Sequence, residues 1–229
     1  MQNILKKNFH ESLITGILLS LVGGILDAHT FLFRNGIFAN TQTGNIVLLA
    51  LFFKTEKVKR TIQCVFSILA FIFGVFLTEF MKTKIKKIEK INYVYITLLI
   101  EFILLFLIGW IPKDCNNTLV IVVISFVCSL QTNVFRSLNG SVYSTTMCTG
   151  NLRSAIANFS EYVLKKDSSK KKVFIKYLII ILSFLFGAAL GRFLTNIMKN
   201  FTLFVASFFI LITLLFLILQ KKLTKKIKT

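Results

Sequence analysis

FRNGIFANTQTGN (residues 33–45) and FRSLNGSVYSTTMCTGN (residues 135–151) are two polar stretches in an otherwise apolar chain. Each contains an Asn-Gly pair and ends in Thr-Gly-Asn, and the second has two extra residues between these anchors. Thr and Asn favour helix N-termini, where their side-chain oxygens accept from free N–H groups, and Gly tolerates unusual backbone angles. The two stretches therefore predict two unwound segments, each leading into the N-terminus of a helix.

The apolar surroundings of these stretches indicate a membrane protein. The chain has 229 residues, of which 55% are hydrophobic and 25 are Phe, and its mean hydropathy is +0.75. A soluble domain of this size has too little interior to bury so much apolar surface, whereas a bilayer solvates it. Pro occurs once and there is no Pro/Gly/Ser-rich linker, so we predict a single membrane domain over residues 1–229.

The predicted fold is an all-α, polytopic membrane helix bundle. A spanning helix needs about 20 predominantly apolar residues. Six stretches meet this requirement, namely residues 12–33, 61–81, 91–111, 118–135, 173–195 and 201–219. Residues 37–53 and 144–164 begin with polar side chains, and we predict that they form short or broken helices at the Thr-Gly-Asn motifs.

The second half of the chain repeats the first. Besides the Thr-Gly-Asn motifs, FIFGVFLTEF (residues 71–80) matches FLFGAALGRF (residues 184–193), with apolar stretches in the same order around both. The sequence predicts internal repeats over approximately residues 9–112 and 117–220. Repeats of this kind are common in transporters, where the substrate site lies at the interface between them.

Two topologies are compatible with this pattern. If the Thr-Gly-Asn helices do not cross the membrane, each half has three spans, the halves are inverted, and both termini are cytoplasmic. If they cross, there are eight spans and the halves are parallel. The positive-inside rule supports the six-span and the eight-span topology almost equally. Arg153 and Glu161 make the second short helix a poor lipid-facing span, which favours the topology with six spans.

The formal charge is +19, and its distribution favours a membrane partner over nucleic acid. The Lys runs at residues 82–90, 165–172 and 221–228 lie at the ends of apolar stretches, where they would contact an anionic cytoplasmic leaflet. The four Cys residues have no zinc-ligand or redox spacing, and there is no phosphate-binding loop or nucleophile elbow. We therefore expect no metal, no cofactor and no catalytic residues of a familiar enzyme class.

Charged side chains inside lipid usually face a partner or water, because each costs at least about 2.5–3.5 kcal/mol at a helix centre. Asp27 and His29 are two residues apart and face roughly opposite sides of a regular helix, so they share a site only if the helix unwinds near Ala28. Asp27 alone could instead bind backbone N–H groups or a cation, and His29 alone could be a packing residue.

The predicted substrate-binding residues come from both halves: Asp27, His29, Asn40, Thr43, Asn45, Gln131, Asn133, Thr146, Thr149 and Asn151. The alternative is that the motifs cap and pack helices without a ligand. In the second half, Gln131 or Thr132 stands in the place of Asp27, so the carboxylate is not duplicated. An asymmetric site of this kind suits coupling to a proton or cation.

Three further charged residues are candidates for ion pairing or proton transfer. Glu79 and Arg192 occupy equivalent positions in the two matching Phe/Gly segments, where they either pair between the halves or extend separately to the membrane interface. Glu101 lies in the middle of an apolar stretch, and it is either a proton site or a buried hydrogen-bonding group.

At these motifs the chain resembles the YoaK family of bacterial membrane proteins, also called the DUF1275 family. The residues that carry the resemblance are Gly24–Ala28, NGIFANTQTGN, the Phe/Gly segment ending at Phe80, SLQTNVFR and TTMCTGN. The family usually has Gln-Asn where this chain has Gln131-Thr132. The resemblance implies a multi-pass protein of the bacterial cytoplasmic membrane, and it supplies no substrate.

The function expected from the sequence is a small transporter or permease for an unknown small solute, with a polar site where the two Thr-Gly-Asn elements approach each other. A membrane-embedded enzyme that uses Asp27 and His29 is the second hypothesis, and a non-transporting membrane scaffold is the third. A transporter requires a polar cavity that water can reach, an enzyme requires both side chains in one open pocket, and a scaffold requires dry, packed motifs. The oligomeric state stays open.

Overall fold

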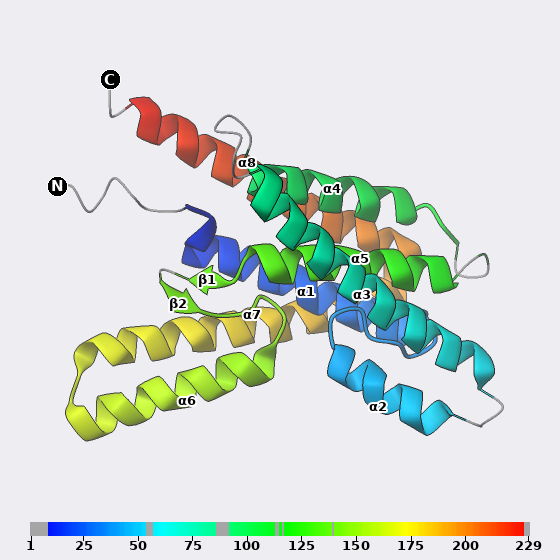
Figure 1. The fold of residues 1–229 in the computed structure, drawn as a ribbon, viewed down its shortest axis with the longest axis horizontal. Helices are drawn as coiled ribbons and strands as arrows, with labels where there is room; N and C mark the ends of the chain where they lie inside the picture. The colour runs from blue at the N-terminus through cyan, green and yellow to red at the C-terminus, as the bar shows by residue number, and fades with distance from the viewer. Residues whose placement is uncertain are drawn as a thin grey trace.

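A computed structural model describes residues 9–53, 57–85, 92–112, 115, 117–138 and 140–226. The long helices are α1 (Leu13–Phe33), α3 (Val58–Ile85), α4 (Tyr93–Ile108), α5 (Asn117–Val134), α7 (Ser168–Met198) and α8 (Thr202–Lys226). The helices at the Thr-Gly-Asn motifs are α2 (Gln42–Phe52) and α6 (Cys148–Lys165). The predicted all-α helix bundle is confirmed (Figure 1).

Two details of the fold differ from the sequence prediction. α3 and α7 extend several residues beyond the predicted 61–81 and 173–195, because polar helix-forming residues continue each apolar stretch. A small antiparallel hairpin, β1 (Ser137–Leu138) and β2 (Ser141–Val142), lies between α5 and α6. The Asn-Gly pair that separates these strands in the sequence is a common hairpin signal. Asn139, Lys54 and parts of the Lys runs at residues 82–90 and 221–228 lie outside the described residues.

Several helices are long and apolar enough to cross a membrane. The ranges are Leu13–Phe33, Val58–Lys84, Asn117–Val134 and Ser168–Leu223. The last range joins α7 to α8 through the 3-10 turn η3 (Lys199–Phe201), and α4 and α2 are shorter apolar helices. At 11 residues α2 is only about 16 Å long, roughly half the thickness of a hydrocarbon core. Large apolar side chains such as Phe76 and Leu185 remain exposed on the outside of the bundle.

α1 packs against α7, and the two helices run in the same direction. Gly16 lies beside Ile180 near one end of the pair, and Gly24 meets the backbone of Phe184 and Ala188 further along. His29 reaches Thr195 near the other end. Glycines at these positions allow the two backbones to approach closely, as is common between membrane helices.

α5 packs against α3 in the same parallel sense. Gln63 of α3 donates to Thr118 at the start of α5, and the Ser67 and Ser125 hydroxyls are 2.7 Å apart. Gly74 lies against Phe126 further along. α4 and α8 are antiparallel to each other, since Gly109 at the end of α4 lies beside Phe204 at the start of α8. Each half of the chain therefore contributes helices that pack chiefly on the other half.

Both short helices begin half-way along the bundle. Asn40, just before α2, donates to the carbonyl oxygen of Gly23, which is the midpoint of α1. Thr146, just before α6, also contacts Gly23. α2 then runs outward to the start of α3, where Thr61 donates to the Phe52 carbonyl oxygen. The chain thus turns back into the bundle after α1 and leaves it by the same end.

Arg34 fixes the end of α1 to two loops. Its side chain is fully buried. Nη1 donates to Asn117 Oδ1 at 2.6 Å and to the Pro112 carbonyl oxygen at 3.4 Å. Nη2 donates to the Ile111 carbonyl oxygen at 3.1 Å and to Asn200 Oδ1 at 2.8 Å. The guanidinium group therefore joins the α4–α5 and α7–α8 connections to α1, a role that the sequence analysis did not assign to it.

We expect Gly36→Ala to lower the free energy of unfolding by about 1 kcal/mol, because L side chains are strained in the left-handed region. Gly36 has φ +75° in the turn after α1, and a Cβ built there meets no atom within 4 Å, so the effect is conformational. Gly150→Ala, in the first turn of α6 with equally open space, is the control and should be neutral or slightly stabilising. Thermal unfolding in detergent measures both, and equal effects would contradict the argument.

Candidate functional site

The two Thr-Gly-Asn elements have the same local structure. Asn45 Oδ1 accepts from the Phe38 N–H at 3.0 Å, and Asn45 Nδ2 donates to the Phe38 carbonyl oxygen at 2.7 Å. Asn151 makes the same pair of hydrogen bonds with Ser144, at 3.1 and 2.6 Å. In each element the asparagine of the motif therefore holds the unwound segment that precedes its helix.

Thr43 and Thr149 do not cap their helices, contrary to the sequence prediction. The N-caps are Thr41 and Met147, two residues earlier, since Asn45 N–H donates to the carbonyl oxygen of Thr41 and Asn151 N–H donates to that of Met147. The two threonines are exposed on the first turn. The structure does not bring them to the place where the elements meet.

Asp27 binds the unwound segment before α2. Its Oδ1 accepts from the N–H groups of Ala39 at 3.0 Å and Asn40 at 2.7 Å, and its Oδ2 accepts from Thr41 Oγ1 at 2.8 Å. The carboxylate is buried. These N–H groups have no helical partner, so the carboxylate occupies the place that an external anion would take. This arrangement is the backbone-binding alternative named for Asp27 from the sequence.

Gln131 has the corresponding role at the second element. Its Nε2 donates to Thr145 Oγ1 at 3.0 Å and to the Leu19 carbonyl oxygen of α1 at 3.1 Å. Thr132 and Thr146 share a hydrogen bond of 3.0 Å beside it. Since Asn40 and Thr146 both contact Gly23, the two elements meet at the middle of α1.

His29 lies apart from this meeting point. Its Nδ1 is 3.2 Å from Thr195 Oγ1, and its ring packs against Phe33. Asp27 and His29 bind different neighbours, and α1 stays helical between them. The shared Asp27–His29 site that a helix break at Ala28 would have allowed is therefore not formed.

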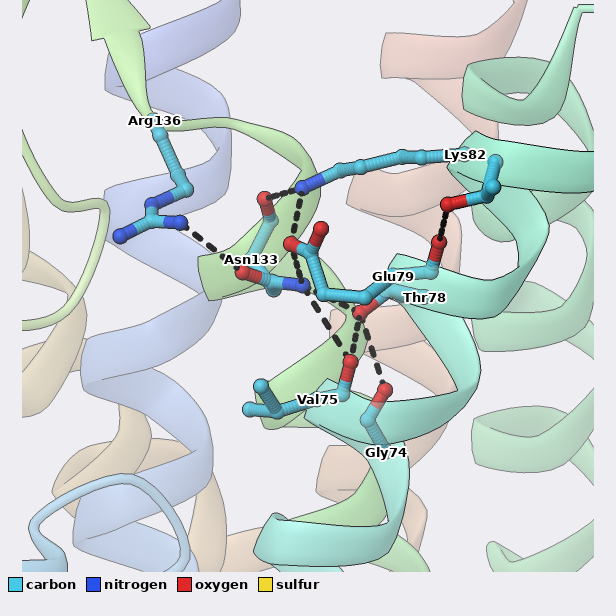
Figure 2. Close-up of polar contacts among 8 residues, drawn as sticks. Gly74, Val75, Thr78, Glu79, Lys82, Asn133 and Arg136 are labelled. Carbon is cyan, nitrogen blue, oxygen red and sulfur yellow. Dashed lines mark hydrogen bonds and ion pairs between the residues drawn. The ribbon is translucent and has the colours of Figure 1, made fainter. Parts of the chain in front are cut away.

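Asn133 joins α5 to the end of α3 (Figure 2). Its Nδ2 donates to Glu79 Oε1 at 2.9 Å and to Thr78 Oγ1, and its carbonyl oxygen accepts from Lys82 Nζ at 2.8 Å. Lys82 also forms an ion pair of 2.9 Å with Glu79. Arg136 reaches Asn133 Oδ1 from the other side, at 3.4 Å. Asn133 is thus part of a polar cluster on the inner side of α3.

Of the two alternatives named for Glu79 and Arg192, the ion pair between them is absent among the described residues. Glu79 pairs with Lys82 one turn away, and Arg192 is exposed on α7, which packs on α1 instead of α3. Glu101 is fully buried in α4, and neither of its carboxyl oxygens has a hydrogen-bond partner among the described residues. Its role as a proton site stays a prediction.

A cavity of about 670 Å³ opens beside the second element. Its walls come from α3, α5, the loop around the hairpin, and the first turns of α6. The polar lining includes Glu79, Thr132, Asn133, Arg136, Asn151 and Arg153. This volume lies within the range of small-molecule sites. The cavity reaches from the cluster around Asn133 to the start of α6.

Several residues of the site were not among the binding residues predicted from the sequence. Thr41 and Gly23 form part of the meeting point, and Arg136 lines the cavity. Thr41 and Arg136 lie inside the two polar stretches, residues 33–45 and 135–151, so membership of these stretches could have indicated both as site residues. Gly23 lies in an apolar helix, where the sequence indicates close helix packing, and its contact with both elements follows only from the approach of two distant loops.

Comparison with known proteins gives one match. A family model described as "Protein of unknown function (DUF1275)" matches residues 15–216. Curated proteins and solved structures give no match. The matched region includes both Thr-Gly-Asn elements and nearly all of the helix bundle described above. The chain therefore belongs to the DUF1275 family.

Proposed function

We propose that this protein is a small membrane transporter or permease, whose solute path runs between its two halves. One observation carries the proposal. Two unwound segments, Asn40–Thr41 and Thr145–Thr146, reach the middle of α1 and lie beside Gly23, and a cavity leads to the second. Unwound backbone at membrane depth is tolerated only where it is buried in protein or lines a cavity. Short helices that end there are typical of transporter sites.

The packing supports inverted repeats over approximately residues 9–112 and 117–220. If α1, α2, α3 and α4 correspond to α5, α6, α7 and α8, then the α1–α7 pair corresponds to the α5–α3 pair. The α4–α5 pair corresponds likewise to the α8–α1 pair. α1 and α5 are antiparallel, since Arg34 at the end of α1 binds Asn117 at the start of α5. If the shorter apolar helix α4 also spans, then α1, α3 and α4 in the first half and α5, α7 and α8 in the second give six spans, with halves of opposite orientation.

The basic ends of the helices support an orientation with both termini cytoplasmic. The C-terminal end of α3, the N-terminal end of α7 and the C-terminal end of α8 carry Lys residues, and these ends lie on the same side of the bundle (Figure 1). Such clusters favour the cytoplasmic side and an anionic leaflet. At the tip between α6 and α7, Lys170 pairs with Glu161 at 2.8 Å and lowers the pKa of that carboxyl group. We assign the protein to the bacterial cytoplasmic membrane.

The two other hypotheses have less support. A membrane-embedded enzyme would need Asp27 and His29 together in one open pocket, but Asp27 binds Thr41 and the backbone, while His29 binds Thr195. A scaffold would need both motifs packed dry, but Asn151 of the second motif lines the cavity. The transporter proposal accounts for both observations.

Thiol labelling tests whether water reaches the second element. In a variant without the native cysteines, we expect Ser154→Cys to react with a membrane-impermeant maleimide in vesicles that expose the cytoplasmic side, because Ser154 lines the cavity. Phe76→Cys and Leu185→Cys are the matched controls, because both side chains are exposed on the apolar outside of the bundle. These two should react little, since a thiolate does not form in lipid.

The first element provides a second comparison. Thr43→Cys and Thr149→Cys report on the two motifs, which enter the bundle from opposite ends, so a transporter should expose them to water from opposite sides. If Ser154→Cys reacted no faster than the lipid-facing controls, there would be no water path to the second element and the transporter proposal would fail.

A further inference from the structure

The cavity beside the second element has walls of two kinds. Phe71, Val75 and Met147 give it an apolar side, while Arg136 and Arg153 give it cationic groups. The two arginines come from different elements, since Arg136 follows α5 and Arg153 lies on the second turn of α6. A cavity with an apolar wall and a few charged groups can bind and orient an amphipathic small molecule.

The charges of the cavity do not cancel. Glu79 is the acidic residue of its lining, and Lys82 already pairs with it at 2.9 Å. Arg136 donates a hydrogen bond to the neutral Asn133 Oδ1, at 3.4 Å. Arg153 forms no ion pair with any described residue. Neither guanidinium group of the lining therefore forms an ion pair in the part of the chain that is described, although Arg136 feels the charge of Glu79.

The level of Arg153 along the bundle makes an anionic partner favourable. α6 begins beside Gly23 at the middle of α1, and Arg153 is five residues after the first residue of α6. This separation is only about 8 Å along the helix axis. A guanidinium group at such a depth needs water or an anion, because lipid solvates it poorly. The cavity provides room for either.

We propose that the cavity binds a small organic anion, with its carboxylate held by Arg136 and Arg153 and its apolar body against Phe71 and Val75. Guanidinium groups bind carboxylates and phosphates through paired, charge-assisted hydrogen bonds. The inference rests on the proposed function, for which it supplies the class of solute. A lipid phosphate has the same chemistry, so the source of the anion has to be separated by experiment.

Benzoate is a suitable probe, because it joins a carboxylate to an apolar ring. Calorimetric titration of the purified full-length protein in a non-ionic detergent should give saturable binding of benzoate, whereas benzylamine, of similar size and opposite charge, should not bind. Arg136→Gln and Arg153→Gln should each weaken benzoate binding by about tenfold or more, the usual effect of losing a charged hydrogen bond. Arg60→Gln, at the opposite end of α3 and exposed, is the matched control and should bind as the parent does.

The same titration in nanodiscs separates the two sources of the anion. If the site serves free anions, benzoate binds equally in phosphatidylcholine discs with and without phosphatidylglycerol. If the site holds a lipid headgroup, phosphatidylglycerol competes with benzoate, and the competition disappears in the two arginine variants. Both results support an anion site. The anion site is overturned if neither benzoate nor phosphatidylglycerol binds, or if the arginine variants bind as well as the parent. The transporter proposal is tested separately by thiol labelling at Ser154.

Discussion

Replacing Asp27 by alanine is expected to lower the free energy of unfolding by about 3 kcal/mol or more. The carboxylate accepts hydrogen bonds from the N–H groups of Ala39 and Asn40 and from the hydroxyl of Thr41. The two N–H groups are buried, whereas the Thr41 hydroxyl is exposed, and each buried donor left without an acceptor costs about 1–3 kcal/mol. The midpoint of thermal unfolding in detergent should therefore fall clearly.

Asp27→Asn separates hydrogen bonding from charge. The amide oxygen can still accept from the N–H groups of Ala39 and Asn40, and the amide nitrogen can donate to the Thr41 oxygen, so we expect less than half of the alanine effect. Because the asparagine variant keeps the fold, it is also the variant in which to test coupling to a proton or cation. Equal destabilisation by Asn and Ala would show that these hydrogen bonds do not hold the first element in place.

The second large effect is expected at Arg34. Arg34→Leu should lower the free energy of unfolding by about 3 kcal/mol or more, because it removes hydrogen bonds to the Ile111 and Pro112 carbonyl oxygens and to the side chains of Asn117 and Asn200. Arg34→Lys keeps the charge, but an ammonium group cannot reproduce the planar fork that spans both loops. We expect lysine to recover only part of the loss.

Arg192→Gln is the control for this series. Arg192 is exposed on α7 and forms no ion pair among the described residues, so its replacement should change stability by no more than about 0.5 kcal/mol. Thermal unfolding of the four proteins in the same detergent makes the comparison. If Arg34→Leu were as stable as Arg192→Gln, the joining role of Arg34 would be wrong.

The helices could be predicted from the sequence because an apolar segment in a membrane has to satisfy its own backbone hydrogen bonds. Apolar stretches of about 20 residues can hardly be anything other than helices, and the predicted range 12–33 differs from α1 by one residue. The ends of α3 and α7 were harder to predict. Lys82 and Ser168 belong to helices that continue past the apolar stretch, where hydropathy no longer marks the boundary.

The site was accessible only in part. Repetition singled out Asn45 and Asn151, and the two make the same hydrogen bonds in the structure. Repetition could not show which helices become neighbours. Glu79 and Arg192 are equivalent in sequence, but each lies on a helix that packs against the opposite half, so equivalence gave no contact between them. The hydrogen-bond partners of a buried residue such as Arg34 lie in two distant connections, α4–α5 and α7–α8, and no local pattern encodes them.

The packing of each half on helices of the other half also determines when during synthesis the fold can be completed. The glycine face of α1 around Gly24 is covered by α7, more than half of the chain length later. During synthesis α1 is therefore made before five further helices and has no partner for this face until α7 follows. No fragment that stops before Phe184 can cover the face around Gly24. A gene split between the two halves should yield two polypeptides that are each unfinished alone and that become protease-resistant only when they are produced together.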